Sequence, residues 1–261
     1  MSAPRAHRTA PDGSPYPDRN APGFEHDVRA MFSEIADGYD TFDHIASLGQ
    51  DLLWRPRALW ALDRFRRGQP APRRALDIGC GTGDLTRLTA RHLRGASVVG
   101  ADFTGPMVAI AADRTDGRAE AARVGYARAS AMRLPFRSGS FDLVLSAFVV
   151  RNLPDLGQAF AELRRVLGPR GTLLTLEITE PASPFVARTF HAYFDAVVPW
   201  LGAAVGRAGP YRYLPESLRH LPPRSEMLAR LTSAGFDRVA AVPHSGGIVT
   251  TYLAEAAEGS R

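Results

Sequence analysis

The sequence predicts an α/β fold: a doubly wound, mostly parallel sheet of seven strands, with helices before the first strand and an aromatic lid insertion. Two observations carry this prediction. Short apolar runs alternate with stretches of helical periodicity, which indicates a parallel sheet with helices on both faces. A glycine-rich turn also follows the first apolar run, which is typical of a strand that leads into a helix at a ligand site.

The N-terminal part divides into two segments. Residues 1–24 are rich in Pro, Gly, Arg and Ala with scarcely any large aliphatic side chains, so they cannot offset the entropy of ordering and we predict a disordered arm. From Asp27 to Arg67 the apolar residues recur at helical spacing, which predicts helices that cover the edge of the sheet or the mouth of its ligand site. We expect one domain over residues 25–254 and a tail at 255–261.

The elements of the sheet follow in order. The expected strands are residues 74–79, 96–101, 123–128, 141–147 and 171–178, and the expected helices are residues 84–93, 106–115 and 155–167. Two further apolar runs, at 236–242 and 248–253, are separated by a connection of hairpin length. They predict an antiparallel pair that closes the sheet.

The insertion at residues 181–224 is too aromatic to be a free loop. Its aromatic side chains are Phe185, Phe190, Tyr193, Phe194, Trp200, Tyr211 and Tyr213. A free loop would expose this apolar surface to water, so we predict a lid.

The glycine turn runs Asp77-Ile78-Gly79-Cys80-Gly81-Thr82-Gly83-Asp84. A dinucleotide fingerprint needs glycine at the sixth position of the turn, where this chain has Asp84. Carboxylates at both ends of the turn would also repel a phosphate at the helix N-terminus. S-adenosylmethionine fits better, because it carries a sulfonium and an ammonium but no phosphate. The alternative is a tight turn whose Asp84 only caps the helix.

Ligands of doubly wound sheets bind outside the carboxyl ends of the strands. The residues expected at these ends are Asp77, Asp102, Ser130 with Ala131, Ala147 and Glu177. Asp102 stands about where an acidic residue holds ribose hydroxyls in such folds, and Ser130 with Ala131 would meet an adenine edge. A serine that ends a strand is otherwise a common turn former.

The amino-acid composition excludes several kinds of catalytic and binding site. The chain has 32 cationic residues and none is lysine, which excludes a Walker-type phosphate loop and a lysine Schiff base. Cys80 is the only cysteine, which excludes an intrachain disulfide, a Cys-rich zinc site and a two-cysteine redox pair. We therefore predict no metal site, and a reducing cytoplasm is the expected compartment.

The net charge of +5 is compatible with an anionic partner, but a solvated surface of mixed charge is the favoured interpretation. No arginine-rich block interleaved with aromatic residues is present, so nucleic acid is not an expected partner. The longest apolar stretch, near residues 196–205, is broken by Pro199 and Gly202, and the N-terminus has no apolar signal core. We expect a cytoplasmic protein, with peripheral contact to the inner face of the membrane left open.

Several separated motifs carry a family resemblance. Outside the insertion they are residues 31–40 (MFSEIADGYD), 47–50 (SLGQ), 53–55 (LWR), 134–136 (LPF), 140–142 (SFD), 151–153 (RNL) and 163–167 (LRRVL). More specific motifs are Tyr193-Phe194 with Val198-Pro199, residues 211–217 (YRYLPES) and residues 246–249 (GGIV). Across residues 28–254 the chain thereby resembles the menaquinone and ubiquinone C-methyltransferase family.

The resemblance implies a class I, Rossmann-like methyltransferase that uses S-adenosylmethionine. With the turn and the strand ends it places the cofactor on Asp77, Gly79, Gly81, Thr82, Gly83, Asp102, Ser130, Ala131 and Ala147. Three positions depart from the family pattern. Val149 replaces a common glycine, Ser130 replaces the more usual asparagine, and Ala147 stands where some members carry serine. These departures leave methyl transfer intact but bear on the choice of quinone.

For methyl transfer to carbon, the protein must align the methyl donor with its substrate and provide a nucleophile. Deprotonating a quinol hydroxyl pushes charge onto the adjacent ring carbon, and a cationic donor in a dry pocket stabilises that phenolate. Arg151 is the first candidate, and Asn152 would orient the same oxygen. The alternatives are a surface ion pair for Arg151 and a helix cap for Asn152. His191 and His244 are weaker candidates for a general base.

We therefore expect a C-methyltransferase acting on a small-molecule polyprenylated quinol, with demethylmenaquinol converted to menaquinol. One alternative is a paralogous C- or O-methyltransferase acting on another aromatic or polyketide compound. A nucleic-acid methyltransferase is a third interpretation, but the chain shows no appended basic module. The sequence leaves the oligomeric state open.

Overall fold

The computed structural model of the chain describes Pro17, Arg19, residues 23–36, His44, residues 47–193, Ser217, Leu218 and residues 221–258. Most of the predicted disordered arm and most of the predicted lid lie outside these residues, as do Tyr211 and Tyr213. Those two expectations stay predictions.

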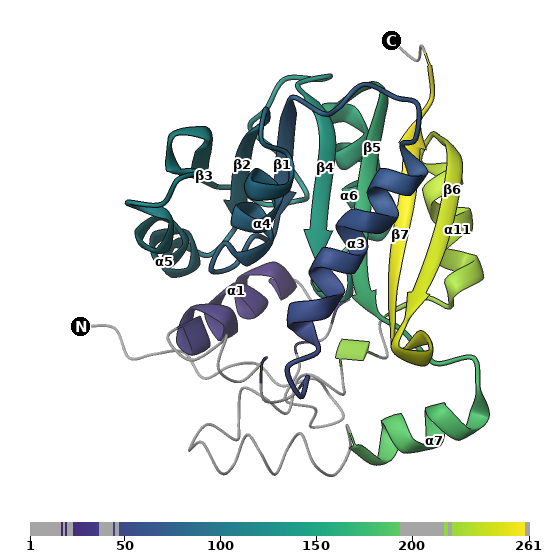
Figure 1. The fold of residues 1–261 in the computed structure, drawn as a ribbon. Helices are drawn as coiled ribbons and strands as arrows, with labels where there is room; N and C mark the ends of the chain where they lie inside the picture. Colours follow the sequence, from purple (N-terminus) through teal and green to yellow (C-terminus); the bar gives the residue numbers. More distant parts are fainter. Residues whose placement is uncertain are drawn as a thin grey trace.

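A seven-stranded sheet forms the centre of the molecule (Figure 1). Its strands are β1 (Arg74–Ile78), β2 (Ser97–Asp102), β3 (Val124–Arg128), β4 (Phe141–Ala147), β5 (Leu167–Ile178), β6 (Phe236–His244) and β7 (Val249–Ala256). They follow the order β3-β2-β1-β4-β5-β7-β6, in which β7 is antiparallel to both neighbours and the other pairings are parallel. The predicted doubly wound sheet and its closing antiparallel pair are confirmed.

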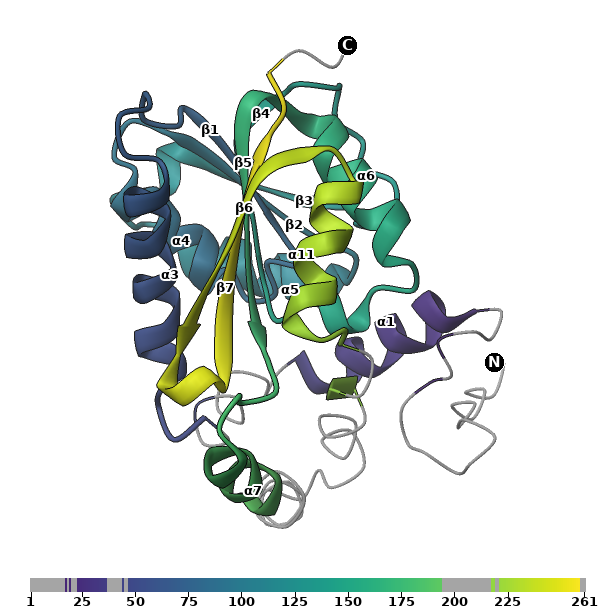
Figure 2. The same cartoon turned by 90° about the vertical axis from the view of Figure 1, so that its right-hand side faces the viewer.

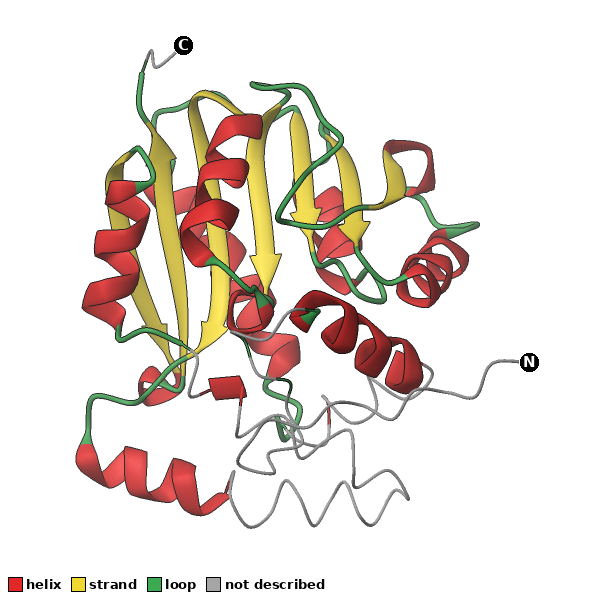
Figure 3. Cartoon of the chain, turned by 180° about the vertical axis from the view of Figure 1, so that it is seen from behind, coloured by secondary structure: helices red, strands yellow, loops and turns green. Residues whose placement is uncertain are grey.

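Helices cover both faces of the sheet. The described helices are α1 (Phe24–Ile35), α3 (Asp51–Phe65), α4 (Asp84–His92), α5 (Gly105–Thr115), α6 (Leu156–Val166), α7 (Pro184–Ala192) and α11 (Arg224–Ser233), with short turns η2 (Ala121–Arg123), η3 (Val150–Asn152) and η5 (Ser245–Gly247). The side view shows α3 and α4 on one face and α6 and α11 on the other (Figure 2). The view from behind shows α6 and α11 in front of the sheet (Figure 3).

The central strands are apolar on both sides because both of their faces are covered. Side chains alternate along a strand, so Leu143 and Leu145 of β4 pack into the core on the α3 and α4 side, whereas Val144 packs into the core on the α6 and α11 side. All three side chains are fully buried. Burial of such surface contributes about 25 cal/mol per Å² to folding, so this double core is the main source of stability.

The N-terminal helices occupy two different places. Helix α3 lies across the sheet and contacts β5 and β7. Helix α1 lies below the carboxyl ends of the strands in Figure 1. The prediction of helices before the first strand is confirmed, and α1 lies at the expected ligand mouth (Figure 1).

The strand order reverses beside β1. From β1 the chain crosses to β2 and then β3 on one side, and it returns to β4 and β5 on the other. Connections that leave in opposite directions open a crevice at the carboxyl ends of β1 and β4, where ligands of this fold bind. Ile78 at the end of β1 pairs with Ala101 of β2 and Ser146 of β4, so three strand ends meet there.

Gly100 of β2 offers a test of how tightly this region is packed. A Cβ at Gly100 would lie 2.6 Å from Cε1 of Tyr126 and 2.9 Å from the Thr86 hydroxyl. We expect Gly100→Ala to lower the free energy of unfolding by about 1–3 kcal/mol through overpacking, measured by urea denaturation. Gly125→Ala is the matched control on the neighbouring strand, because a Cβ there meets no atom within 4 Å. Equal stabilities of the two variants would contradict the prediction.

Candidate functional site

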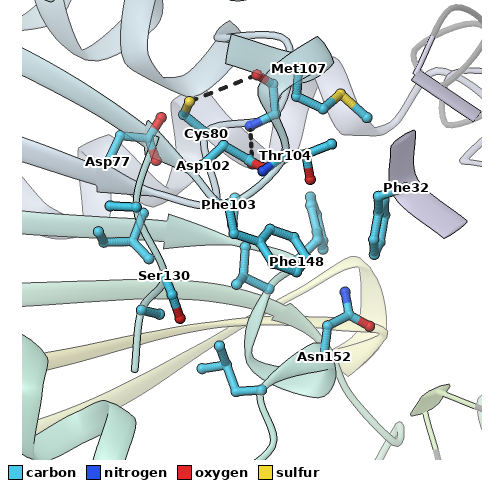
Figure 4. Close-up of a pocket in the computed structure, with 18 of the residues that line it drawn as sticks. Phe32, Asp77, Cys80, Asp102, Phe103, Thr104, Met107, Ser130, Phe148 and Asn152 are labelled. Atoms are coloured by element: carbon cyan, nitrogen blue, oxygen red, sulfur yellow. Dashed lines mark hydrogen bonds between the residues drawn. The ribbon is translucent and has the colours of Figure 1, made fainter. Parts of the chain in front are cut away.

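A pocket of about 990 Å³, counted with the solvent at its mouth, lies at the strand ends. Its wall includes many of the residues expected from the sequence, namely Asp77, Gly79, Gly81, Thr82, Asp102, Ser130, Ala131, Ala147 and Asn152. In Figure 4, Asp77, Cys80, Asp102 and Thr104 lie on one side, and Ser130 and Asn152 lie across from them. We call this the first pocket. Gly83 and Arg151 are not on its wall.

The glycine turn brings backbone to the wall of the first pocket. Gly81 has a φ of 52°, and a Cβ there would meet nothing within 4 Å because it would point into open space. Gly83 is the N-cap of α4 and faces the interior instead, since a Cβ there would lie 2.6 Å from the Tyr126 hydroxyl. Gly81 therefore leaves room for a ligand, whereas Gly83 allows the helix to pack.

Val149, where the family resemblance leads us to expect glycine, lies directly against the turn. A Cβ added to Gly79 would lie 2.3 Å from Cγ2 of Val149. Val149 also lines the first pocket. The branched side chain of Val149 thus fills space that a glycine would leave open at this wall, and it packs against the glycine turn.

Asp102 ties the end of β2 to the glycine turn. Its carboxylate accepts a hydrogen bond from the Gly81 N–H at 3.0 Å and another from the Thr104 N–H at 2.8 Å. Burial raises the pKa of Asp102, and these two N–H groups oppose the rise. The carboxylate is therefore held in one orientation on the pocket wall.

Asp77 is buried at the end of β1 with 1% of its surface exposed. The Thr86 hydroxyl donates to its Oδ2 at 2.6 Å, and no cation is hydrogen-bonded to it among the described residues. Burial raises the pKa of Asp77 to about 7. A positively charged ligand in the first pocket would favour its ionised form.

Asp84 is the first residue of α4 and makes no side-chain cap bond, so the interpretation of a helix cap is wrong. Its Oδ1 accepts from Nη2 of Arg87 at 2.5 Å, and Nη1 of Arg87 donates to the Thr82 carbonyl at 2.8 Å. Arg87 therefore offsets the charge of Asp84 and anchors the turn. The preference of the pocket for a cation rests on Asp77 and Asp102.

Arg151 and Asn152 follow β4 directly in η3, yet they face different cavities. Asn152 lines the first pocket, and Arg151 lines a second one. Arg151 is 2% exposed, and its Nη1 lies 2.5 Å from Oε1 of Glu177 at the end of β5. The ion pair is therefore buried rather than on the surface. The cap of α6 is Asp155, which accepts from the Gln158 N–H at 3.0 Å, so the cap interpretation of Asn152 is also wrong.

The second cavity, of about 1040 Å³ with its open mouth, is mostly apolar. Its wall comes from distant parts of the chain, namely Ser47, Leu48, Gln50, Asp51, Trp54, Phe148, Arg151, Ile178, Val186, Thr189, Phe190, Tyr193 and Ile248. Burial raises the pKa of the Tyr193 phenol, so it stays protonated at neutral pH. We call this the second pocket.

Phe148 lines both pockets and forms the wall between them. Its backbone has the unusual φ of 62°, and its N–H donates to the Leu176 carbonyl at 2.7 Å. The Arg55 and Arg151 guanidiniums lie 5.7 and 5.8 Å from the ring centroid, and the Trp54 ring lies 6.1 Å away. Cation–π attraction to both guanidiniums holds the ring in place.

Sequence reasoning did not find several wall residues of the first pocket. They are Glu25 and Phe32 of α1, Arg55 of α3, and Phe103, Thr104 and Met107 after β2. The strand-end rule that found Asp102 would also have found Phe103 and Thr104, because they follow it directly. Nothing local in the sequence could show that α1 and α3 reach the same pocket.

The two weaker histidine candidates lie on neither pocket wall. His191 is paired with Glu180 at 2.9 Å on the surface. Burial lowers the pKa of His244, which lines a separate groove beside α3. Within the described ranges, no helix is long and apolar enough to cross a membrane, and no group of three or more His, Cys, Asp or Glu side chains is placed to hold a metal ion.

A model of the ubiE/COQ5 methyltransferase family matches residues 22–255, nearly the whole sheet and its helices. The chain belongs to this family. A demethylmenaquinone methyltransferase of Thermus thermophilus is 43% identical over 79% of this chain and 91% of its own length. The ubiquinone/menaquinone biosynthesis C-methyltransferase UbiE of Geobacter sulfurreducens is 36% identical over 87% and 88%. The family resemblance found in the sequence is confirmed.

Solved structures show the same fold at low identity. A SAM-dependent methyltransferase of Thermotoga maritima, titled a possible histamine N-methyltransferase, aligns with a TM-score of 0.59 and 17% identity over 87% of this chain and 98% of its own. The phosphoethanolamine N-methyltransferase 2 of Haemonchus contortus, solved with S-adenosyl-L-methionine, aligns with a TM-score of 0.55 and 18% identity over 78% of this chain and 53% of its own. The class I methyltransferase fold is thereby confirmed.

The family member is a methyltransferase, and its methyl donor is S-adenosylmethionine. The first pocket fits this donor. Gly81 leaves open space in which the ligand can approach the backbone closely. The pocket also holds buried carboxylates, and among the described residues no cation is hydrogen-bonded to that of Asp77. A sulfonium or ammonium group would compensate the cost of keeping such a carboxylate ionised.

Asp77→Asn should reveal the cost of this buried charge. The folded protein holds a proton on Asp77 up to about pH 7, whereas an unfolded aspartate loses it near pH 4. The contribution of this group to stability is therefore lost as pH rises from about 4 to about 7, and at pH 8 the ionised group destabilises the donor-free protein. Asparagine keeps an acceptor for Thr86, so Asp77→Asn should be more stable than the parent at pH 8 by about 1–4 kcal/mol.

The measurement is urea denaturation without donor at pH 8 and at pH 4, where parent and variant should be nearly alike. Calorimetry at pH 8 should show roughly tenfold weaker binding of S-adenosylmethionine to the variant, because one charged contact is lost. A stability difference that is the same at both pH values would contradict the assignment.

Proposed function

We propose that the protein transfers the methyl group of S-adenosylmethionine to a ring carbon of a polyprenylated quinol, converting demethylmenaquinol to menaquinol. The names of the relatives support this substrate class. The observation that carries the proposal is the junction at Phe148: a pocket walled by carboxylates meets an apolar pocket that holds a buried guanidinium. A cationic donor and an apolar acceptor can meet there.

The proposed donor contacts follow from the first pocket. Asp102 would accept hydrogen bonds from the ribose, and Asp77 would face the cationic end of the donor. Ser130 and Ala131 would border the adenine. The remaining contacts are Gly79, Gly81, Thr82 and Ala147, while Gly83 shapes the turn behind the wall.

The proposed acceptor contacts lie around Phe148. The bound donor supplies a methyl group that is already activated as a sulfonium. Arg151 would donate hydrogen bonds to the phenolate oxygen in the second pocket, and Asn152 would orient the ring from the first. Glu177 neutralises part of the guanidinium charge, so Arg151 acts as a fixed and oriented donor rather than as a free cation.

A second candidate is a C- or O-methyltransferase acting on another aromatic or polyketide compound. The observation that favours it is Val149, which fills part of the wall where the family pattern has glycine. A bulkier wall would change which ring fits beside the donor.

The deciding experiment is an assay of the purified protein with methyl-labelled S-adenosylmethionine and reduced demethylmenaquinone. Mass spectrometry should find the label on the quinone ring carbon, and reduced menaquinone, whose ring position is already methylated, should remain unlabelled. A protein that binds the donor but leaves demethylmenaquinol unlabelled would move the conclusion to the second candidate.

The Arg151–Glu177 pair allows stability to be separated from turnover. Arg151→Met alone should lower the free energy of unfolding by about 3–5 kcal/mol, because it leaves the Glu177 carboxylate buried without a cationic partner. The double variant Arg151→Met/Glu177→Leu should regain most of this stability, measured by thermal unfolding. Its donor affinity should stay at the parent value while turnover remains at least about 100-fold reduced. A double variant with parental turnover would remove Arg151 from the reaction.

The proposal includes peripheral contact of this cytoplasmic enzyme with the membrane that holds its quinol. Leu48 on the wall of the second pocket is 70% exposed, and Phe185 at the start of α7 is 80% exposed. Helix α7 and the first turn of α3 lie at the same end of the molecule (Figure 2). Exposed apolar side chains beside exposed cations such as Arg188 are typical of a surface that binds anionic lipid.

Vesicle binding tests this surface. The double variant Leu48→Ser/Phe185→Ser should bind anionic phospholipid vesicles about tenfold more weakly than the parent, because two large apolar side chains no longer enter the membrane. Trp60→Ser is the control, since Trp60 is 62% exposed on α3 but lies beside the groove near β6. Equal binding by all three proteins in a sedimentation assay would contradict a role for this rim.

A further inference from the structure

A cluster of polar side chains at the mouth of the second pocket has no role in the reaction described so far. Its members are His44, Ser47, Asp51 and Arg55. Asp51 and Ser47 line the pocket, and Asp51 is only 6% exposed. His44 belongs to the turn before α3, where its carbonyl accepts from the Gly49 N–H at 2.8 Å. The turn that forms the pocket wall therefore also holds His44.

The Asp51 carboxylate is fixed by three donors. Its Oδ2 lies 3.0 Å from Nδ1 of His44 and 3.3 Å from Nη1 of Arg55. Its Oδ1 accepts from the Ser47 hydroxyl at 2.8 Å. The ion pair with Arg55 and the hydrogen bond from Ser47 fix the orientation of the Asp51 carboxylate. The carboxylate can therefore orient the His44 imidazole.

The contact with Asp51 assigns the tautomer of His44. A carboxylate beside Nδ1 favours the imidazole with its proton on Nδ1, and the lone pair then stands on Nε2. Nε2 has no hydrogen-bond partner among the described residues, and 46% of the His44 side chain is exposed. His44 thus carries a proton acceptor that water can reach. Its partner Asp51 lines the pocket that we propose for the quinol.

We propose that His44, positioned by Asp51, is the general base that takes the hydroxyl proton of the quinol, directly or through one water. This inference rests on the proposed function. The charged and titratable groups on the wall of the second pocket are Asp51 of α3, Arg151 of η3 with Glu177 behind it, and Tyr193 after α7. Arg55 pairs with Asp51 and lines the first pocket. Of these, Asp51 alone contacts the His44 ring.

Proton transfer from the quinol to His44 precedes the transfer of the methyl group. The O–H bond of the quinol breaks, its proton goes to Nε2 of His44 and its electron pair stays on oxygen, where Arg151 stabilises it. The adjacent ring carbon forms a bond to the methyl group while the sulfur–methyl bond breaks and leaves its electron pair on sulfur. The ring carbon then loses its hydrogen to water as a proton, and the oxygen regains a proton from His44. One proton is released for each methyl group transferred.

Two other histidines have a similar carboxylate partner but a different setting. His92 of α4 lies 3.0 Å from Asp63, and His191 lies 2.9 Å from Glu180. Asp63 and Glu180 line neither pocket, whereas Asp51 lines the second pocket. The position of its carboxylate partner on the wall of the second pocket therefore distinguishes His44. His92 supplies the matched control.

The test measures turnover of the full chain with reduced demethylmenaquinone across pH 5 to 9. His44→Gln should lower kcat at least about 100-fold, the usual contribution of a general base, with unchanged donor affinity by calorimetry. The acid limb of the pH profile, which reports the base in its unprotonated form, should disappear. His92→Gln should keep both the rate and the limb.

Two further variants keep the proposal falsifiable. Asp51→Asn should lower kcat but leave donor affinity at the parent value, because the imidazole loses the carboxylate that orients it. His44→Ala should regain rate on addition of imidazole, which a purely structural role would not allow. If the parent turns over the quinol and His44→Gln keeps a rate within threefold with the same acid limb, His44 is not the base. If the parent itself leaves the quinol unmethylated, the proposed function fails instead.

Discussion

The reversal of strand order beside β1 is the constraint on which the rest of the structure depends. Parallel strands need crossover connections, and those of this sheet leave β1 and β4 in opposite directions. No crossover can therefore fill the space at the carboxyl ends of these strands. The first pocket, the glycine turn after β1 and the η3 turn after β4 all lie at this one opening.

Buried carboxyl groups gather at this opening, and each has different hydrogen-bond donors. Glu177 has a guanidinium partner, Asp102 has two backbone N–H groups, and Asp77 has one hydroxyl. Desolvation raises the pKa of all three carboxyl groups, and it raises that of Asp77 to about 7. The carboxyl group with the fewest donors is thus the one whose ionisation a bound cation would change most.

Phe148 connects this charged region to an apolar one. A left-handed backbone conformation is costly for a residue with a Cβ, and here the bond to Leu176 and the packing of Trp54, Arg55 and Arg151 around the ring sustain it. The ring lines both the pocket that holds the carboxylates and the second pocket. Chemistry between a cationic donor and a water-insoluble acceptor requires such an arrangement, because each ligand needs its own environment and the reacting atoms must still meet.

The sequence alone determined the sheet, because the apolar runs, the hairpin-length connection at 243–247 and the glycine turn are local signals. It also placed Asp77, Asp102, Ser130 and Ala147 at one edge, since strand ends of a doubly wound sheet share an edge by topology. It could not show that Arg151 turns away from Asn152 toward Glu177, because neighbours in a tight turn point in different directions that only packing selects. Nor could it bring His44 and Asp51 to the pocket of Arg151, about 100 residues further along the chain. Local patterns specify elements and strand ends, but the second pocket exists only where α3, η3 and α7 meet, and that meeting is decided by the burial of side chains from all three.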